Sequence, residues 1–529
     1  MLFYRTEDFR PEEILDFYVE TPGDDVIVSE LKSRVPVILR GSRGVGKSFL
    51  LRVAEAQLNE RWDHDRILPV YMTFSKAALL RLPAEESFLP WMCAKITTSI
   101  KRALRSKGIA LDSQSALSEL SRGSAAAGGV SLDDRLVTER EQKFWKQGTP
   151  IEDASALTDT EELRQAIEDL CDDYEIDRVV LLIDEAAHVF VPNQQRQFFT
   201  LMRDLRSPYV SVKASVYPGA TSFGPSFQPT HDATVRDVER DVMADGYAEA
   251  MRSIVLKQDP QGAEKAAKNG AALDVLAYAS MGNPRIFLKT FAEASPYRLN
   301  DFKDVLKNYY SEQIWSEHSS LAERYPGHRV LIDWGRRFID EEVLPNLRDR
   351  NQDATAASSA IWIHRNAPQA VREALSLLSY SGIVQEGTPN IKATRSELGS
   401  RYVVNFGCHV SGATDPVGYG KKLHDSFTLK RMREFGSDHS AFLPLRKMDI
   451  LEDPSSINLA LKARLQESYE VLDLTAFQKA KLKELGAVTI QDVLETDEES
   501  FLGLHYVGPV RASQIHNAAQ TAVVEYLSG

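Results

Sequence analysis

The sequence predicts an α/β fold in which a buried parallel sheet is followed by helices. Short and almost wholly apolar runs occur at 35–40, 67–74, 178–184 and 209–216, and helical patterns separate them. Strands that alternate with helices in this way form parallel sheets covered on both faces. From about 241 to 300 the periodicity is helical throughout, which predicts a small helical lid after the sheet.

The first apolar run leads into a glycine-rich loop with the pattern GxxxxGK[ST]. The loop consists of Gly41, Ser42, Arg43, Gly44, Val45, Gly46, Lys47 and Ser48. Glycines at these places allow backbone N–H groups to surround phosphate oxygens where a helix begins. In this pattern the lysine supplies positive charge to the outer phosphates, and the serine hydroxyl is a ligand for Mg²⁺. The sequence therefore predicts a site for a nucleotide polyphosphate.

Two acidic residues follow the third apolar run. Asp184 ends that run and Glu185 comes next. A carboxylate at the end of a strand beside the glycine loop can hold Mg²⁺ through water, so Asp184 is the predicted metal residue together with Ser48. Glu185 is placed to polarise an attacking water molecule, as a general base does.

These motifs, with "MGNPRIFLK" at 281–289 in the helical lid, resemble AAA+ and related STAND P-loop ATPases, and most of all ATPases of the origin-recognition initiator type. The resemblance implies ATP and Mg²⁺ as cofactors and ATP hydrolysis as the activity. It also implies that Arg285 contacts the outer phosphate from the lid and acts in catalysis beside Lys47 and Glu185. The likeness covers about the first 300 residues strongly and the next region weakly.

One expected feature of such ATPases is missing from the sequence. They usually complete the site with an arginine from a neighbouring subunit, placed after the fourth strand, but residues 217–235 contain no arginine. Either that arginine has moved, or hydrolysis is slow and does not depend on a ring of subunits. Ser215 and Thr221 are both candidates for the polar residue at the end of the fourth strand. The arginines nearest to the expected position are Arg203, Arg206 and Arg236.

The second half of the chain has two further predicted modules. Residues 301–410 end in a helix followed by two short strands, the outline of a winged helix. Residues 473–529 resemble a helix-hairpin-helix domain like the carboxy-terminal domain of the RNA polymerase alpha subunit. In that family the hairpin glycine exposes N–H groups to a DNA phosphate, which makes Gly508 and Arg511 candidate DNA-binding residues. The stretch from 474 to 529 has four basic and seven acidic residues, so docking of a protein is an equal alternative.

A partly basic linker with one or two helices is expected at 411–472, between these modules, because the pattern there is broken and partly polar. From 421 to 447 it contains seven basic residues and three acidic ones, in a chain whose formal net charge is −13. The alternatives are a solvated helix face and a track for a DNA backbone. The candidate DNA-binding residues are Lys421, Lys422, Lys430, Arg431 and Arg433.

Length and composition set the remaining expectations. The 529 residues imply several domains, with an ATPase core at 1–240 that carries a mobile insertion at about 108–158. Three cysteines far apart in sequence and no apolar run of roughly 18 residues favour a reduced cytoplasmic protein without a membrane segment.

Two functions of different kinds fit these observations. The first is an ATPase that acts as a nucleotide-dependent switch and binds duplex DNA through its C-terminal modules. Assembly into a homo-oligomer is compatible with this function. The second is a STAND-like signalling or phage-defence ATPase that hydrolyses ATP slowly and recruits a protein effector. A metabolic kinase is disfavoured because no acceptor site is readable.

Overall fold

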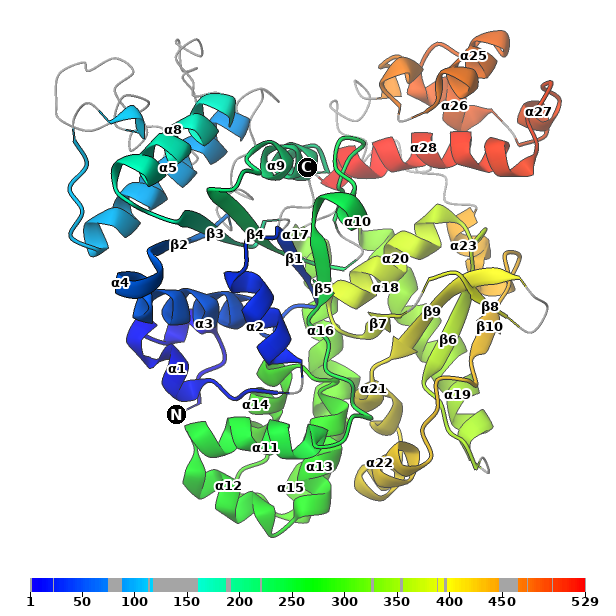
Figure 1. Cartoon of the computed structure of the whole chain (residues 1–529). Coiled ribbons are helices and arrows are strands. Elements are labelled where there is room, and N and C mark those ends of the chain that lie inside the picture. Colours follow the sequence, from blue (N-terminus) through cyan, green and yellow to red (C-terminus); the bar gives the residue numbers. More distant parts are fainter. Residues whose placement is uncertain are drawn as a thin grey trace. The chain divides into compact units, whose positions relative to one another are not determined.

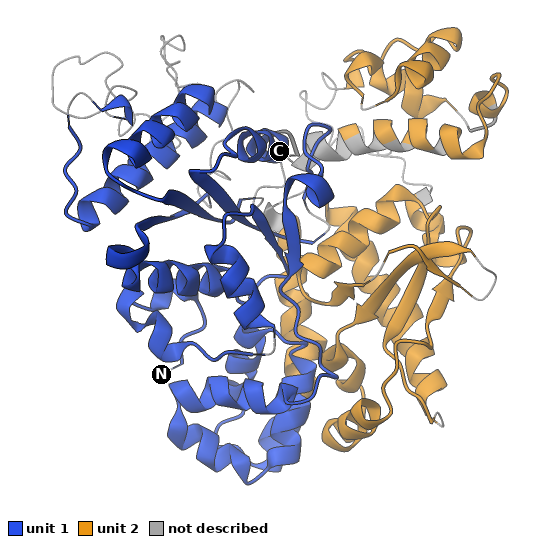
Figure 2. Cartoon of the chain, viewed as in Figure 1, with its two compact units in different colours: residues 1–305 blue, residues 306–529 orange. Residues whose placement is uncertain are grey.

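The computed structural model divides the chain into two compact units, residues 1–305 and residues 306–529 (Figure 2). The structure describes residues 2–21, 23–74, 88–112, 115–117, 160–186, 192–218, 221–324, 328–352, 355–387, 389–393, 397–446, 465–472, 474–496 and 498–528. Most of the insertion expected at 108–158 lies outside these residues.

Unit 1 is built on a five-stranded sheet with the order β2-β3-β4-β1-β5, in which all neighbours are parallel. The predicted α/β fold with a parallel sheet is thereby confirmed. Strand β4 lies between β1 and β3, so the glycine loop after β1 and the acids after β3 flank the end of β4. The bounds are β1 Val37–Arg40, β2 Ile67–Thr73, β3 Arg178–Asp184, β4 Val210–Val216 and β5 Thr234–Asp237. The sequence analysis predicts the first four strands and does not predict β5.

Helices cover both faces of this sheet (Figure 1), because alternate side chains of each strand are apolar on both sides. In β3, Val180 and Leu182 join the core formed with the helices on one face, while Leu181 and Ile183 join the core on the other. The first face is covered by α1 (Ile14–Phe17), α2 (Asp24–Lys32) and α3 (Lys47–Glu60). The second is covered by α5 (Phe88–Ser106), α8 (Thr160–Asp173) and α9 (Pro192–Asp204). Short helices α4 (Trp62–Asp65) and α10 (Pro229–Asp232) precede β2 and β5.

The helical lid follows β5. Its helices are α11 (Tyr247–Gln258), α12 (Pro260–Ala267), α13 (Gly270–Ala279), α14 (Pro284–Glu293) and α15 (Leu299–Asn308). Helix α14 begins where the sequence dictates, because Pro284 occupies the first turn and the Asn283 side chain accepts a hydrogen bond from the Ile286 N–H at 3.2 Å. This start fixes the position of the next residue, Arg285.

Unit 2 contains a mixed sheet with the order β10-β6-β9-β7, and β8 pairs with β9. Its strands are β6 (Ala360–His364), β7 (Val384–Glu386), β8 (Ile391–Lys392), β9 (Leu398–Val404) and β10 (Arg433–Phe435). The predicted helix with two strands after it is present as α20 (Gln369–Tyr380) and the antiparallel pair β7 and β9, with the short β8 between them in sequence. However, α20 is the one helix between β6 and β7 in the described chain, so the helix-turn-helix of a winged helix is not formed there.

The predicted linker contains a strand of the sheet. Residues 416–435 form α22 (Pro416–Asp425), a helix of the kind expected in this stretch, and β10, which is not predicted and pairs in parallel with β6. A bridge between Ala357 and Phe427 adds to this pairing. The three residues of β10 are too few for an alternating pattern, so the sequence does not predict this strand. Residues 447–464 lie outside the described chain.

The other described helices of unit 2 pack beside this sheet or follow it. They are α16 (Ile314–Ser319), α17 (Leu321–Arg324), α18 (Arg329–Arg337), α19 (Leu344–Asn351), α21 (Phe406–Val410) and α23 (Leu443–Arg446). At the end of the chain, α25 (Ala476–Glu484), α26 (Ile490–Glu495), α27 (Glu498–Leu502) and α28 (Pro509–Ser528) enclose a small core of their own. No helix in the described part of the chain is both long and apolar enough to cross a membrane.

Candidate functional site

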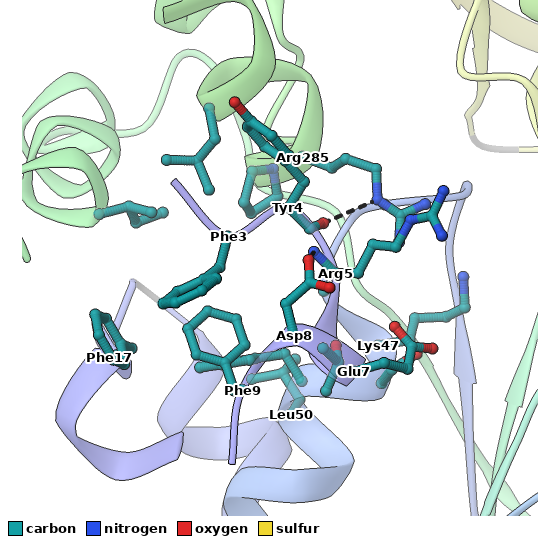
Figure 3. A pocket seen from close by; sticks show the side chains of 18 of the residues that line it. Phe3, Tyr4, Arg5, Glu7, Asp8, Phe9, Phe17, Lys47, Leu50 and Arg285 are labelled. Atoms are coloured by element: carbon teal, nitrogen blue, oxygen red, sulfur yellow. Dashed lines mark hydrogen bonds between the residues drawn. The ribbon is translucent and has the colours of Figure 1, made fainter. Parts of the chain in front are cut away.

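A cavity of about 400 Å³ lies in unit 1 where the glycine loop meets the lid (Figure 3). Residues from several separate segments line it. These are the N-terminal segment (Phe3 to Phe9, Phe17 to Val19 and Asp24), the loop and first turn of α3 (Arg43, Gly44 and Gly46 to Leu50), the residues after β3 and β4 (Glu185 and Tyr217), Arg240, and the lid (Ile254, Gln258, Pro284, Arg285 and Leu288). The cavity therefore holds most of the predicted nucleotide-binding residues.

The glycine loop takes the conformation that its sequence requires. Gly44 and Gly46 have φ angles of +92° and +104°, which side chains other than hydrogen rarely permit. A Cβ atom on Gly44 would also lie 2.8 Å from the Asn283 side chain and 3.0 Å from Cβ of Arg285. The loop glycine thus allows both the turn and the close approach of the lid.

Lys47 begins α3, and its side chain is buried at the inner end of the cavity. The ammonium Nζ donates hydrogen bonds to the carbonyl oxygens of Gly41 at 2.6 Å and Ser42 at 3.0 Å. It also lies 4.1 Å from the centre of the Tyr217 ring, on the ring face. These contacts hold the ammonium group at the base of the loop.

Three cationic side chains meet at this end of the cavity. Burial lowers the pKa of Lys47 to about 7, with Arg285 and Arg43 acting in the same direction. Burial and the charge of Arg43 also lower the pKa of Arg285. The Arg285 Nε donates to the carbonyl oxygen of Tyr4 at 3.1 Å (Figure 3). Like charges gathered in a partly buried cavity destabilise one another, so an anion bound among them is strongly favoured.

Asp184 is held by hydrogen bonds from two neighbouring strands. The Ser215 hydroxyl donates to its Oδ1 at 2.6 Å, and the Tyr71 hydroxyl donates to its Oδ2 at 2.9 Å. Ser215 lies at the end of β4, where the sequence analysis leaves a choice between Ser215 and Thr221. The Thr221 hydroxyl instead donates to the Tyr217 carbonyl at 2.7 Å, so Ser215 is the one that contacts the acid.

Glu185 has an unusual backbone and an unusual acidity. Its φ angle is 54°, uncommon for a residue with a side chain, and its N–H donates to the Ser215 hydroxyl at 2.8 Å. Burial raises the pKa of the Glu185 carboxyl to about 7, and the charges of Asp184 and Glu7 add to the effect. A carboxyl group with a pKa near 7 can both accept and release a proton at neutral pH.

The donor set fits a magnesium ion bound chiefly by a ligand's phosphates and by water. Asp184 and Ser48 are the predicted protein ligands, and Ser48 lines the cavity. Among the described residues there is no group of three or more histidine, cysteine, aspartate or glutamate side chains that could form an all-protein cage. Magnesium sites next to phosphates use only one or two protein oxygens.

The opposite end of the cavity is apolar. The rings of Phe3, Phe9 and Phe17 pack against one another with centroid distances of 5.0, 5.9 and 5.1 Å (Figure 3). The backbone N–H of Phe3 donates to Oε1 of Gln258 on α11 at 2.8 Å, which attaches this segment to the lid. An apolar end and a cationic end in one cavity match a flat base and its phosphates. The sequence analysis missed the segment, although four aromatic residues in positions 3–17 were a signal.

Arg240 is a second residue that the sequence analysis missed. Its guanidinium binds Asp24 at 3.0 Å and the Thr21 hydroxyl at 2.9 Å, and the Arg240 and Asp24 side chains are only 10% and 5% exposed. It also donates to the carbonyl oxygens of Val45 in the loop and Gly282 in the lid, at 2.8 and 3.1 Å. Arg240 therefore joins the N-terminal segment, the loop and the lid.

None of the three arginines near the position expected for a subunit-bridging arginine lines the described cavity. Arg236 binds both carboxylate oxygens of Glu30, at 2.7 and 2.5 Å. Arg203 donates to the Ser226 carbonyl oxygen at 2.8 Å, and Arg206 is exposed.

The candidate DNA-binding residues of unit 2 lie in two places. Lys421 and Lys422 are on α22, and Lys430, Arg431 and Arg433 follow on the way to and within β10. Two of these side chains bind backbone carbonyls: Lys422 contacts Gln352 at 3.0 Å and Arg431 contacts Ala356 at 2.6 Å.

The second place is the turn before α28. A Cβ atom on Gly508 would meet no atom within 4 Å, so the backbone there is open to solvent. The Arg511 guanidinium donates to the Tyr506 carbonyl at 2.6 Å and lies 5.0 Å from the centre of the exposed Phe477 ring. The exposed Tyr506 ring of the turn and the exposed Phe477 ring of α25 therefore both lie near Arg511.

Comparison with known proteins gives one family match. Residues 2–86 match the sequence model of the family described as ORC-CDC6-like. No curated protein matches the chain significantly. Solved structures similar to the chain include the Aeropyrum pernix ORC1 protein in complex with DNA, at 11% identity over 78% of this chain and 92% of that chain, with a TM-score of 0.32. Another is the Aeropyrum pernix ORC2 protein (ADPNP–ADP complexes), at 10% identity over 78% and 93%, with a TM-score of 0.33. Because both TM-scores are low, the family match is the comparison that bears on this site, and it spans the aromatic segment and the glycine loop.

Proposed function

We propose that unit 1 binds ATP with Mg²⁺ and hydrolyses it, and that the nucleotide state controls modules of unit 2 that bind duplex DNA. The observation that carries the proposal is the meeting of Lys47, Arg43 and Arg285 at one end of a cavity whose other end is aromatic. This arrangement suits a nucleoside triphosphate, and the ORC-CDC6-like match of residues 2–86 supports it.

The residues divide the chemistry among them. Lys47 and Arg285 would neutralise the outer phosphates, and Asp184 with Ser48 would hold Mg²⁺, which screens phosphate charge when bound. Glu185 orients a water molecule and accepts its proton, for which a pKa of about 7 is suited. The hydrogen bonds from Ser215 and Tyr71 keep Asp184 in one orientation.

The DNA part of the proposal rests on charge. The stretch from 421 to 433 carries five basic residues within an acidic chain, and the turn at Gly508 is open to solvent. Contacts of this kind go to the DNA backbone and do not read sequence.

ATP turnover by the wild-type protein and by Glu185→Gln, with and without duplex DNA at low salt, tests the proposal. We expect Glu185→Gln to bind ATP and lose turnover, and Glu60→Gln, at an exposed position on α3, to behave as wild type. Lys47→Ala is expected to lose nucleotide binding. Turnover that persists in Glu185→Gln would remove this residue from the mechanism, and DNA that neither binds nor changes turnover would refute the DNA part.

The second candidate is a slow ATPase switch that recruits a protein effector. The last domain favours it, because residues 474–529 are acidic overall and expose Val488, Tyr506 and Val510 at 65%, 72% and 58%. Exposed apolar side chains are typical of protein contacts. Capture of a protein partner by the ATP-bound form of Glu185→Gln, without any DNA requirement, would favour this function over DNA binding.

A further inference from the structure

Hydrolysis of a phosphoanhydride requires positive charge beside the oxygen atoms that gain negative charge as the bond breaks. The segment 217–235 provides no arginine for this purpose, and the next one, Arg236, is bound by both oxygens of Glu30. The charge must therefore come from elsewhere in this chain or from another copy of it.

Arg43 is the third residue of the glycine loop, and it is exposed where it lines the cavity. Its guanidinium forms no hydrogen bond or ion pair with the residues that the structure describes, whereas the guanidinium of Arg285 is bound to Tyr4. The positive charge of Arg43 nevertheless interacts with Lys47, Arg285 and Glu185, since it acts to lower the pKa of each of them. It thus lies near the predicted phosphate cation, the lid arginine and the predicted base at once.

The backbone of Arg43 is fixed, although its guanidinium has no hydrogen-bond or ion-pair partner within the described part of the chain. The Asn283 side-chain amide donates to the Arg43 carbonyl oxygen at 2.8 Å. The next residue, Gly44, is held in its left-handed conformation against the lid. An arginine with an anchored backbone and an unpaired guanidinium is well suited to contact a ligand, because little order is lost on binding.

We propose that Arg43 is a catalytic arginine that acts in cis, so that this site needs no arginine from a neighbouring subunit. The inference rests on the ATPase function proposed above. In the reaction, the oxygen of water forms a bond to the γ-phosphorus while the bond from that phosphorus to the bridging oxygen breaks. The water proton passes to Glu185 and then to the released phosphate, and the electron pair of the broken bond stays on ADP. Arg43 stabilises the negative charge that develops on the bridging oxygen between the β- and γ-phosphates.

Arg43→Ala, Arg43→Lys and two control variants test the proposal in the full-length protein. We expect Arg43→Ala to lower kcat about 100-fold, as loss of one transition-state donor does, and to change the Kd for ATP less than about threefold. Arg43→Lys should recover part of the rate. Arg102→Ala, on α5, and Arg206→Ala, after α9, replace exposed arginines outside the cavity lining and should keep the wild-type kcat. Turnover per site should not depend on protein concentration.

Several outcomes would overturn the proposal. One is a wild-type kcat in Arg43→Ala. Another is a loss of rate in Arg206→Ala or Arg203→Ala together with turnover per site that rises with protein concentration, which would assign the arginine to a neighbouring copy. Equal losses of kcat and of ATP affinity in Arg43→Ala would assign a binding role instead. A wild-type protein that binds ATP without hydrolysing it would refute the ATPase function itself, an outcome distinct from the others.

Discussion

Replacing Arg240 by methionine is expected to destabilise the region where the glycine loop, the lid and the N-terminal segment meet. The free energy of local unfolding of this region should fall by about 3–5 kcal/mol. The reason is burial: Arg240 and Asp24 are 10% and 5% exposed, and the guanidinium also satisfies the carbonyl oxygens of Val45 and Gly282. Methionine keeps the side-chain length but leaves the Asp24 carboxylate without its cation and two carbonyl oxygens without this donor. Breaking a buried pair from one side costs more than the pair itself contributes.

Hydrogen exchange measured peptide by peptide is the appropriate assay, because a chain with two units does not unfold in one step. A loss of 3–5 kcal/mol corresponds to exchange on the order of 10²- to 10⁴-fold faster in α2, the loop and the start of α14. Arg40 and Asp237 offer a matched control, since this bidentate pair, at 2.5 and 2.9 Å, is 42% and 45% exposed. Arg40→Met should cost about 0–1 kcal/mol.

A loss below about 1 kcal/mol in Arg240→Met, equal to that in Arg40→Met, would refute the reasoning from burial. The double variant Asp24→Asn with Arg240→Met provides a second check. If the buried charge is the main cost, Asn at position 24 should recover part of the loss, because it removes the uncompensated carboxylate.

Three more predictions concern the same cavity. First, the affinity for ATP should fall as pH rises from 7 to 9, because burial lowers the pKa of Lys47 in the free protein to about 7 and bound phosphate requires the charged form of this lysine. Calorimetry in two buffers should show that binding takes up protons. An affinity for ATP that stays constant over this pH range would contradict the assignment. Tyr71→Phe removes the 2.9 Å hydrogen bond to Asp184 and should lower kcat about three- to tenfold while nucleotide affinity without Mg²⁺ stays the same. Gly282→Ala should lower the Tm more than Gly246→Ala. Both glycines have positive φ (72° and 79°), but only at Gly282 would the new methyl lie 2.7 Å from an arginine side chain, that of Arg240. Equal shifts in Tm for the two variants would show that the protein relieves the contact between the new methyl and Arg240.

Local sequence patterns could predict the parts of this site whose chemistry lies in adjacent residues. The loop from Gly41 to Ser48 and the acids at Asp184 and Glu185 each follow an apolar run, and parallel strands bring their ends to one edge of the sheet. The lid arginine is readable for the same reason, because Asn283 and Pro284 define the helix start just before it.

The parts that could not be predicted depend on partners far apart in sequence. Arg240 binds residues 21 and 24 on one side and 282 on the other, so no local pattern marks it. The β10 strand has three residues and gains its pairing only from β6, which lies about 70 positions earlier. The stretch around it is predicted to be a linker because its pattern is broken and partly polar, and a strand of three residues adds no alternating pattern to it.

The contacts around the loop also limit how a nucleotide could act as a switch. The loop is already held by protein groups, since Asn283 binds the Arg43 carbonyl and Arg240 binds those of Val45 and Gly282. Nucleotide binding would therefore add little order to the loop, so ordering of the loop cannot be the main change that reports a bound nucleotide. The Arg285 bond to Tyr4 is different, because an outer phosphate that recruits this guanidinium competes with the N-terminal segment for it. Moving an equilibrium from mostly one state to mostly the other takes about 5.5 kcal/mol, and one charge-assisted hydrogen bond supplies about 1.5–3 kcal/mol. One such bond is therefore too little, and the outer phosphate must contact at least two of Lys47, Arg43 and Arg285 differently in the two states of the equilibrium. A switch that responds to ATP but not to ADP requires Arg285 together with Arg43 or Lys47.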